Sequence, residues 1–193
     1  MMFKQEITNE EVNQLPLVQF TGEIAVIDDL ETQDSAVDEL LEYEVLGFDT
    51  ETKPTFRKGV KRWVAIIQFA TMEKAYIFRI FKSEIGDKLK YLMEREDIIK
   101  VGVALDDDLK GINELRSFSP GGFIALEKKV KEFGILSNGL RKLSGIILDR
   151  RISKSAQVSD WEAETLSEKQ LIYAATDAWI CLKMWMNLAL SDR

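Results

Sequence analysis

The spacing of apolar residues is what most constrains the fold of this chain. Three runs rich in β-branched and aromatic residues lie close together, at 45–48, 63–69 and 75–78. Such runs are typical of buried strands. Because short connections favour neighbouring antiparallel strands, we expect a three-stranded meander. A further short strand is predicted at 23–27, ahead of the meander.

Helical patterns dominate the second half of the sequence. One more buried strand is expected at 98–103, and helices at 35–43 (opened by a Ser or Asp cap), 82–95, 107–115, 123–133, 138–146 and 167–190. The last helix begins with the capping-box pattern Ser167-x-x-Gln170. Strands that alternate with helices after a meander indicate an α/β fold, with helices on the faces of a mixed sheet.

The size and composition of the chain favour a single domain. Its 193 residues, 46% of them hydrophobic, suffice for one packed core. We expect one domain over 1–193, with a core of about 23–190 and an N-terminal extension of about 1–22. No apolar run is long enough to span a membrane and no secretory signal is visible, so a cytoplasmic protein without membrane contact is expected. The single cysteine, Cys181, lies among apolar residues and is expected to be buried.

The sequence contains no histidine. Catalysis by Ser-His-Asp or Cys-His groups within this chain and a histidine-rich zinc site are therefore excluded. General acid or base chemistry must fall to carboxylates, lysine, tyrosine or water activated by a metal ion.

Charge is distributed unevenly along the chain. The net charge is −7, but residues 1–51 hold 14 acidic residues and one basic residue, and the remainder carries a net charge of +6. Basic residues gather in three clusters, which are Lys53, Arg57, Lys58, Lys61 and Arg62; then Lys128, Lys129, Lys131, Arg141 and Lys142; and then Arg150, Arg151 and Lys154. A nucleic-acid backbone could follow such a positive track. Solvated loops and helix faces are an equally simple interpretation of any one cluster.

Carboxylates follow or interrupt apolar patterns at three places. Asp49 and Glu51 are two apart on a strand, so they share one face. Tyr173 and Asp177 are four apart on the last helix and also share a face. Each pair alone could be a solvated strand end or a polar stripe, but an aspartate within so apolar a helix is costly to bury without a partner.

The third place is an acidic triplet, Asp106, Asp107 and Asp108, after the strand at 98–103. All three are candidate helix N-caps, and periodicity does not distinguish them. Carboxylates without imidazole or thiolate suit hard divalent ions such as Mg²⁺ or Mn²⁺. Two such ions about 3.5–4 Å apart can hold the attacking and leaving oxygens of a phosphoryl displacement.

Three motifs, VLGFDTET, KVGVALDDDLKGI and LSEKQLIYAATDAW, resemble those of the DEDD 3′–5′ exonucleases with a tyrosine in the last motif. This family includes ribonuclease D and the Werner exonuclease domain, and WVAIIQFATMEKAYIF and VSDW are similar to the Werner-type branch. The resemblance implies a ribonuclease H-like fold, a mixed five-stranded sheet flanked by helices. It also implies two Mg²⁺ or Mn²⁺ ions and release of nucleoside 5′-monophosphates from a single-stranded or recessed 3′ end of DNA or RNA.

The resemblance assigns a role to each motif residue. Asp49, Glu51 and Asp177 would hold one ion, with Asp49 bridging to a second ion that Asp108 supports, and Tyr173 would position the attacking water. Alignment of the KVGV segment selects Asp108 from the triplet. The first basic cluster would contact nucleic acid, although Thr52-Lys53-Pro54 replaces the aromatic residue that often follows the first motif. The alternatives left open are a catalytically silent binding or adaptor module, a preference for DNA or for RNA, and a helicase or polymerase partner.

Overall fold

A mixed β-sheet forms the centre of the molecule. The computed structural model describes residues 3–55 and 62–191, and in this part of the chain the sheet has six strands in the order β1-β4-β3-β2-β5-β6. The antiparallel meander β2-β3-β4 is present as expected, and β1, β5 and β6 join it in parallel. The strands are β1 (Glu23–Ile27), β2 (Val45–Thr52), β3 (Val64–Ala70), β4 (Lys74–Phe78), β5 (Ile99–Gly102) and β6 (Phe123–Ala125).

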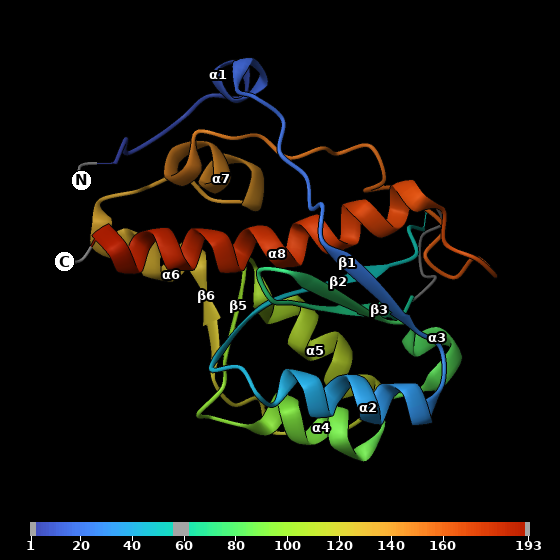
Figure 1. Ribbon diagram of the computed structural model, residues 1–193. Coiled ribbons are helices and arrows are strands. Elements are labelled where there is room, and N and C mark those ends of the chain that lie inside the picture. The colour runs from blue at the N-terminus through green and yellow to red at the C-terminus, as the bar shows by residue number, and fades with distance from the viewer. Residues whose placement is uncertain (1–2, 56–61, 192–193) are drawn as a thin grey trace.

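Helices cover both faces of the sheet (Figure 1). One face carries α2 (Leu30–Leu40), α4 (Asp87–Glu94) and α5 (Leu105–Leu115), and the other carries α7 (Leu140–Leu148) and the long α8 (Glu168–Ser191). The remaining described helices are short: α1 (Asn9–Gln14), α3 (Ile80–Ser83), α6 (Leu126–Lys129) and the 3₁₀ helix η1 (Val130–Phe133). No helix in the described ranges is both long and apolar enough to cross a membrane.

Side chains alternate between the two layers along β2. Leu46 and Phe48 are fully buried in the core beneath α2, α4 and α5, whereas Gly47 faces α8. Because successive residues of a strand point to opposite faces, Asp49 and Glu51 also face α8. The two acidic side chains of β2 therefore point into the layer that contains α8.

Close packing holds α8 against β2. Three alanines of the helix, Ala174, Ala175 and Ala178, are fully buried. A Cβ atom built on Gly47 would lie 2.0 Å from the carbonyl oxygen of Ala178. Only a glycine on the strand and small residues on the helix allow this approach, which brings Asp177 above Asp49.

The sequence-based expectations differ from the structure at several elements. The expected helix at 123–133 begins as β6, which pairs in parallel with β5 and gives the sheet six strands instead of five. The expected helix at 82–95 is divided into α3 and α4, because Glu84 adopts a positive φ of 55°. The helix expected at 35–43 begins at Leu30, and its cap is Asp29, whose side chain accepts from the Thr32 amide.

The segment before β1 packs on the domain. The amide of Val18 donates to the carbonyl of Arg151 at 2.9 Å, and the amide of Phe20 donates to Thr176 Oγ1 on α8 at 3.0 Å. Phe20 also packs against Trp179, with ring centroids 5.8 Å apart. These contacts lay residues 17–20 beside the half of α8 that carries the acidic motif.

Substitution Gly47→Ala should lower the free energy of unfolding by about 3 kcal/mol, because the added methyl group meets a rigid helix backbone. Urea denaturation measures the loss. Gly111→Ala on α5 is the matched control, since its Cβ meets only a methyl group of Val64, at 3.0 Å, and alanine is favoured within a helix. Equal losses in the two variants would show that the close approach of α8 to β2 does not restrict the side chain at position 47.

Candidate active site

Three carboxylates from two elements converge above the sheet. Asp49 and Glu51 come from β2, and Asp177 comes from α8. One ligand oxygen from each lies within 4.8 Å of the others. The register of β2 against β3 shifts between Glu51 and Thr52, so the regular ladder ends where the acidic pair leaves the sheet. The three side chains thus form a compact cluster of hard oxygen donors.

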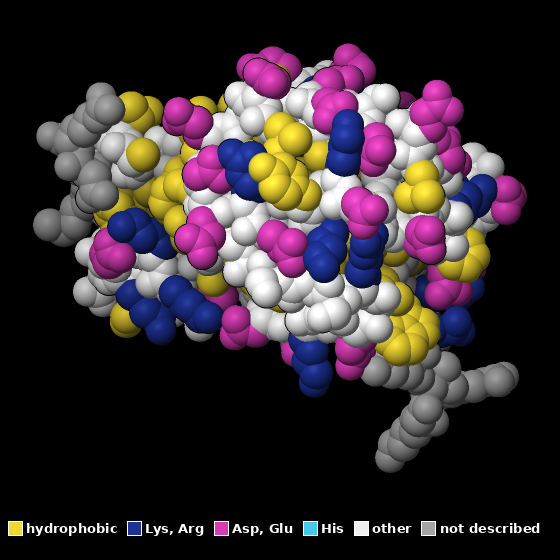
Figure 2. All heavy atoms as spheres, turned by 90° about the horizontal axis from the view of Figure 1, so that it is seen from below, with side chains coloured by type: hydrophobic (Ala, Val, Ile, Leu, Met, Phe, Trp, Pro, Cys, Tyr) yellow, Lys and Arg dark blue, Asp and Glu magenta, His cyan; other side chains and the backbone are white. Residues whose placement is uncertain are grey.

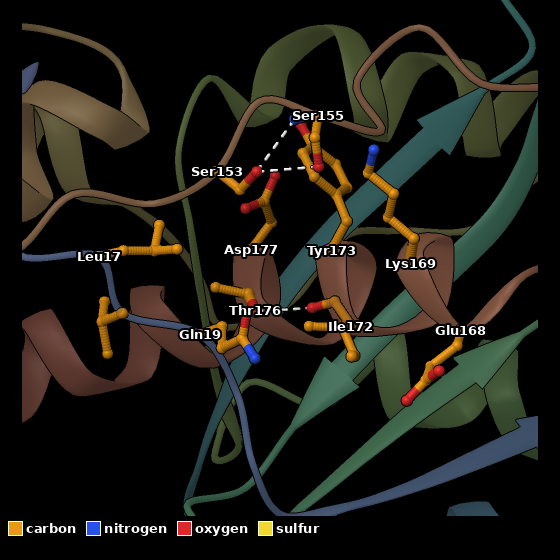
Figure 3. Close-up of a pocket in the computed structure, with 11 residues that line it drawn as sticks. Leu17, Gln19, Ser153, Ser155, Glu168, Lys169, Ile172, Tyr173, Thr176 and Asp177 are labelled. Carbon is orange, nitrogen blue, oxygen red and sulfur yellow. Dashed lines mark hydrogen bonds between the residues drawn. The ribbon is translucent and has the colours of Figure 1, made fainter.

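The first turns of α8 hold Tyr173 and Asp177 on one face. The expected capping box is confirmed, since Ser167 N donates to Gln170 Oε1 at 3.0 Å and Gln170 N donates to Ser167 Oγ at 3.4 Å. Figure 3 shows Tyr173 and Asp177 pointing to the same side of the helix, towards Ser153. The shared face predicted from their spacing is therefore present.

Asp108 lies beside this cluster rather than within it. Its Oδ1 accepts a 2.5 Å hydrogen bond from Thr50 Oγ1, and Thr50 lies between the two acids of β2. None of the acidic triplet, whose members were all candidate N-caps, caps α5: the N-cap is Ala104, in a left-handed conformation with φ 59°. The triplet instead occupies the first turn of α5, with Asp106 and Asp107 exposed and Asp108 half-buried.

Burial and mutual repulsion raise the pKa values of the clustered acids. Burial, then the charges of Asp177 and Asp108, raise the pKa of Glu51 to about 9. The pKa of Asp49 is also raised well above its usual value, first by burial and then by Asp177. Burial raises the pKa of Asp177 to about 7, against the lowering effect of a hydrogen bond with Tyr173. In the absence of a cation, the fold therefore opposes simultaneous ionisation of these groups.

The cluster has the properties of a divalent metal site. Asp177 is 5% exposed, and its Oδ1 has no hydrogen-bond partner in the described chain. An unpaired carboxylate oxygen in such a position is costly unless a cation approaches it. All the donors are carboxylate oxygens, the ligands preferred by Mg²⁺ and Mn²⁺. The residues present therefore fit the metal that their chemistry implies.

A cleft of 440 Å³ opens onto the carboxylates. Asp49, Glu51, Tyr173 and Asp177 form its floor, and basic residues of the described chain line its wall at Arg141, Lys142 and Lys154. Ser153, Tyr173 and Asp177 also line a neighbouring cavity of 390 Å³ between α8 and residues 17–19 (Figure 3).

The basic residues at the cleft are not those favoured by the sequence. Of the cluster that begins at Lys53, the residues Arg57, Lys58 and Lys61 lie outside the described residues. Lys53 pairs with Asp160 at 2.8 Å and with Glu162 at 3.4 Å, and Arg62 pairs with Glu162 at 3.4 Å. A role for this cluster in binding nucleic acid stays a prediction. Arg141, Lys142 and Lys154 had a sequence signal only as members of the two later clusters.

Cys181 is buried one turn after Asp177, as expected. Its Sγ donates to the carbonyl of Asp177 at 3.3 Å, and burial raises the pKa of the thiol well above its usual value. The thiol is therefore held as an unreactive neutral group beneath the acidic cluster.

Comparison with known proteins agrees with this geometry. A family model described as 3′-5′ exonuclease matches residues 24–191. The bifunctional 3′-5′ exonuclease/ATP-dependent helicase WRN of Mus musculus is 34% identical over 153 residues, which are 75% of this chain and 11% of that protein. A 3′-5′ exonuclease of Arabidopsis thaliana is 32% identical over 148 residues, 69% of this chain and 49% of that protein. The chain thus spans about a tenth to a half of the length of these relatives.

Solved structures share the fold. The Nibbler EXO domain of Aedes aegypti superposes with a TM-score of 0.80 at 22% identity, covering 90% of this chain and 91% of that one. Escherichia coli RNase D gives a TM-score of 0.76 at 21% identity, over 90% of this chain and 46% of that one. The ribonuclease H-like architecture is therefore confirmed, with six strands in the described part of this sheet. The family model covers most of the sequence, and the chain belongs to the 3′–5′ exonuclease family.

Proposed function

We propose that this chain is a metal-dependent 3′–5′ exonuclease that hydrolyses the terminal phosphodiester bond of DNA or RNA and releases nucleoside 5′-monophosphates. The observation that carries the proposal is the convergence of Asp49, Glu51 and Asp177 within 4.8 Å at the floor of a cleft. We propose that residues 1–193 form one catalytic domain, with its core at about 23–190 and an N-terminal extension of about 1–22.

Each acidic residue has a role in holding two Mg²⁺ or Mn²⁺ ions. Glu51 and Asp177 would hold one ion, Asp49 would contribute to both, and Asp108 would support the second from α5. When bound, such ions lower the pKa of an attacking water and neutralise charge on the phosphate. The hydrogen bond from Thr50 fixes the orientation of Asp108 before any ion binds.

Tyr173 acts as an orienting group rather than as a base. Burial, then the charges of Asp177 and Glu51, raise the pKa of its hydroxyl above the usual value. The phenol therefore stays protonated at neutral pH and can hold a water molecule by hydrogen bonding. Tyr173 therefore contributes the orientation of the water and not the removal of its proton.

The substrate backbone is held by the basic wall of the cleft. Arg141, Lys142 and Lys154 line the same cleft as the acids, so they can pair with phosphates of a strand that lies in it. On the opposite face of the molecule, over α2 and α4, acidic and basic side chains are interspersed (Figure 2). Trypanosoma brucei RNase D, which shares this fold with a TM-score of 0.73 at 17% identity, has been solved in complex with RNA U12, and RNA is therefore one candidate substrate of this chain.

Asp108→Asn should lower the exonuclease rate about 100-fold, because a support of the second ion is lost. The measurement follows shortening of a 5′-labelled single strand, as DNA and as RNA, with Mn²⁺ and with EDTA. Asp107→Asn is the matched control: it removes a neighbouring exposed carboxylate and should leave the rate unchanged. Absence of metal-dependent shortening by the unsubstituted protein would instead favour a catalytically silent binding module.

The metal-free protein should lose stability as pH rises from about 6 to about 9. The folded-state pKa values of Glu51 (about 9) and Asp177 (about 7) lie above the unfolded values near 4, so the folded state binds more protons over this range. Thermal unfolding measured against pH tests this slope. Mn²⁺ should raise the Tm more at about pH 8 than at about pH 5.5, because it binds the ionised form.

Asp49→Asn is the control for this titration. It removes one charge from the cluster, so both the slope and the gain in Tm from Mn²⁺ should be smaller. A metal-free Tm that rises with pH, or a gain from Mn²⁺ that is equal in the variant, would contradict the assignment.

The double variant Lys142→Glu/Lys154→Glu should weaken binding of a single strand and reduce its salt dependence by about two phosphate contacts. Binding is measured in Ca²⁺ or EDTA, where cleavage does not interfere, over a series of salt concentrations. Lys88→Glu, at a residue of α4 paired with Asp38, is the matched charge control and should leave the slope unchanged. An unchanged slope in the double variant would exclude this wall as the phosphate track.

A further inference from the structure

The segment that leads into α8 carries a buried tryptophan against the candidate water-orienting tyrosine. Trp161 is 0% exposed, although its neighbour Asp160 is exposed. Its ring lies 6.0 Å from the ring of Tyr173 between centroids, at an angle of 39°. Both rings belong to one cluster of buried residues, together with Ala65, Ile66, Ile77, Ala156, Leu166 and Ala174.

A buried arginine fixes the backbone beside Trp161. Arg79 follows β4, and its side chain is 3% exposed. Its Nη1 donates to the carbonyl of Glu164 at 2.9 Å, and its Nη2 donates to the carbonyl of Ala163. A guanidinium in such a position is costly unless its donors are paired, so these bonds hold residues 163–164 against the end of the sheet.

Ion pairs on the outer side of the segment are exposed or only partly buried and are weaker restraints. Lys53 binds Asp160, Arg62 binds Glu162, and Lys82 binds Glu164 at 2.7 Å. Pairs of this kind contribute little individually because water screens them. The position of the segment is therefore determined mainly from the inside, by Trp161 and by Arg79.

We propose that Trp161 is a positioning residue that fixes the ring of Tyr173, and that Arg79 keeps Trp161 in place. The backbone of α8 fixes the Cα position of Tyr173, but the side-chain torsions of this residue depend on what its ring packs against. The hydroxyl is at the far end of the ring, so a small rotation about the side-chain bonds displaces it from the acidic cluster. Misplacement of this size is enough to reduce turnover.

The choice of tryptophan supports this role. The indole Nε1 of Trp161 is buried and has no hydrogen-bond partner in the described chain. A leucine or phenylalanine would fill the core without burying an unpaired donor. The chain nevertheless has tryptophan at this position, where its wide ring lies beside the ring of Tyr173.

This inference rests on the proposed exonuclease function, in which Tyr173 orients water. The test compares Trp161→Leu with the unsubstituted chain in two backgrounds, native and Tyr173→Phe. We expect Trp161→Leu to lower kcat about tenfold in the native background, with KM nearly unchanged, and to have no further effect once the hydroxyl is absent. An equal loss in both backgrounds would overturn the positioning role and leave the exonuclease function standing.

Two further variants separate positioning from general loss of stability. Trp179→Leu removes another buried indole of the same domain, one that packs on Phe20, and should lower the Tm without a background-dependent loss of kcat. If Trp161→Leu does not fold, Arg79→Lys provides the same test. Lysine keeps the positive charge but cannot reproduce the donation from two guanidinium nitrogens to the carbonyls of Ala163 and Glu164. A kcat loss for Arg79→Lys that persists in the Tyr173→Phe background would overturn the proposal.

A measurement without turnover tests the same contact. The chain has four tyrosines, so 3-fluorotyrosine labelling gives four ¹⁹F resonances, and Tyr173→Phe identifies the one from Tyr173. Trp161→Leu should shift and broaden this resonance, whereas Trp179→Leu should not. An unchanged Tyr173 resonance in folded Trp161→Leu would overturn the proposal even if the protein has no nuclease activity.

Discussion

The approach of one helix to one strand is the contact on which the rest of the structure depends. Where Gly47 of β2 meets the carbonyl of Ala178, no side chain separates the two backbones. The acids of β2 and the acid of α8 are consequently neighbours, although more than 120 residues separate them in the sequence. Loops and surface charges could vary widely around this contact without dispersing the cluster.

The same contact creates an electrostatic conflict. Packing leaves Asp49 half-buried and Asp177 buried, and burial raises the pKa of both carboxyl groups. A protein selected for stability alone would place neutral residues there, because like charges close together in a partly buried site oppose folding. A cation at the site would resolve this conflict, and folding and metal binding would then be coupled through the same atoms.

Local patterns predicted the strands of the meander and the capping box of α8 because both depend on residues close together in the sequence. The shared face of Asp49 and Glu51 and that of Tyr173 and Asp177 were also predicted, since side-chain direction follows from strand and helix geometry. Elements determined by distant contacts were missed. Residues 123–125 have a helical pattern but extend along β5, and Asp29 caps a helix whose start carries few apolar residues. The acidic partners of Lys53 and Arg62 lie about a hundred positions away in the sequence, and no local pattern reveals such pairs.

The inert state of Cys181 has a practical consequence. The chain has one cysteine, and this thiol is buried and held neutral. Thiol-directed probes should therefore ignore the native protein, so a cysteine introduced on its surface becomes a unique attachment point. A fluorophore attached beside the basic wall of the cleft could then report arrival of a nucleic-acid strand, without the removal of the native cysteine.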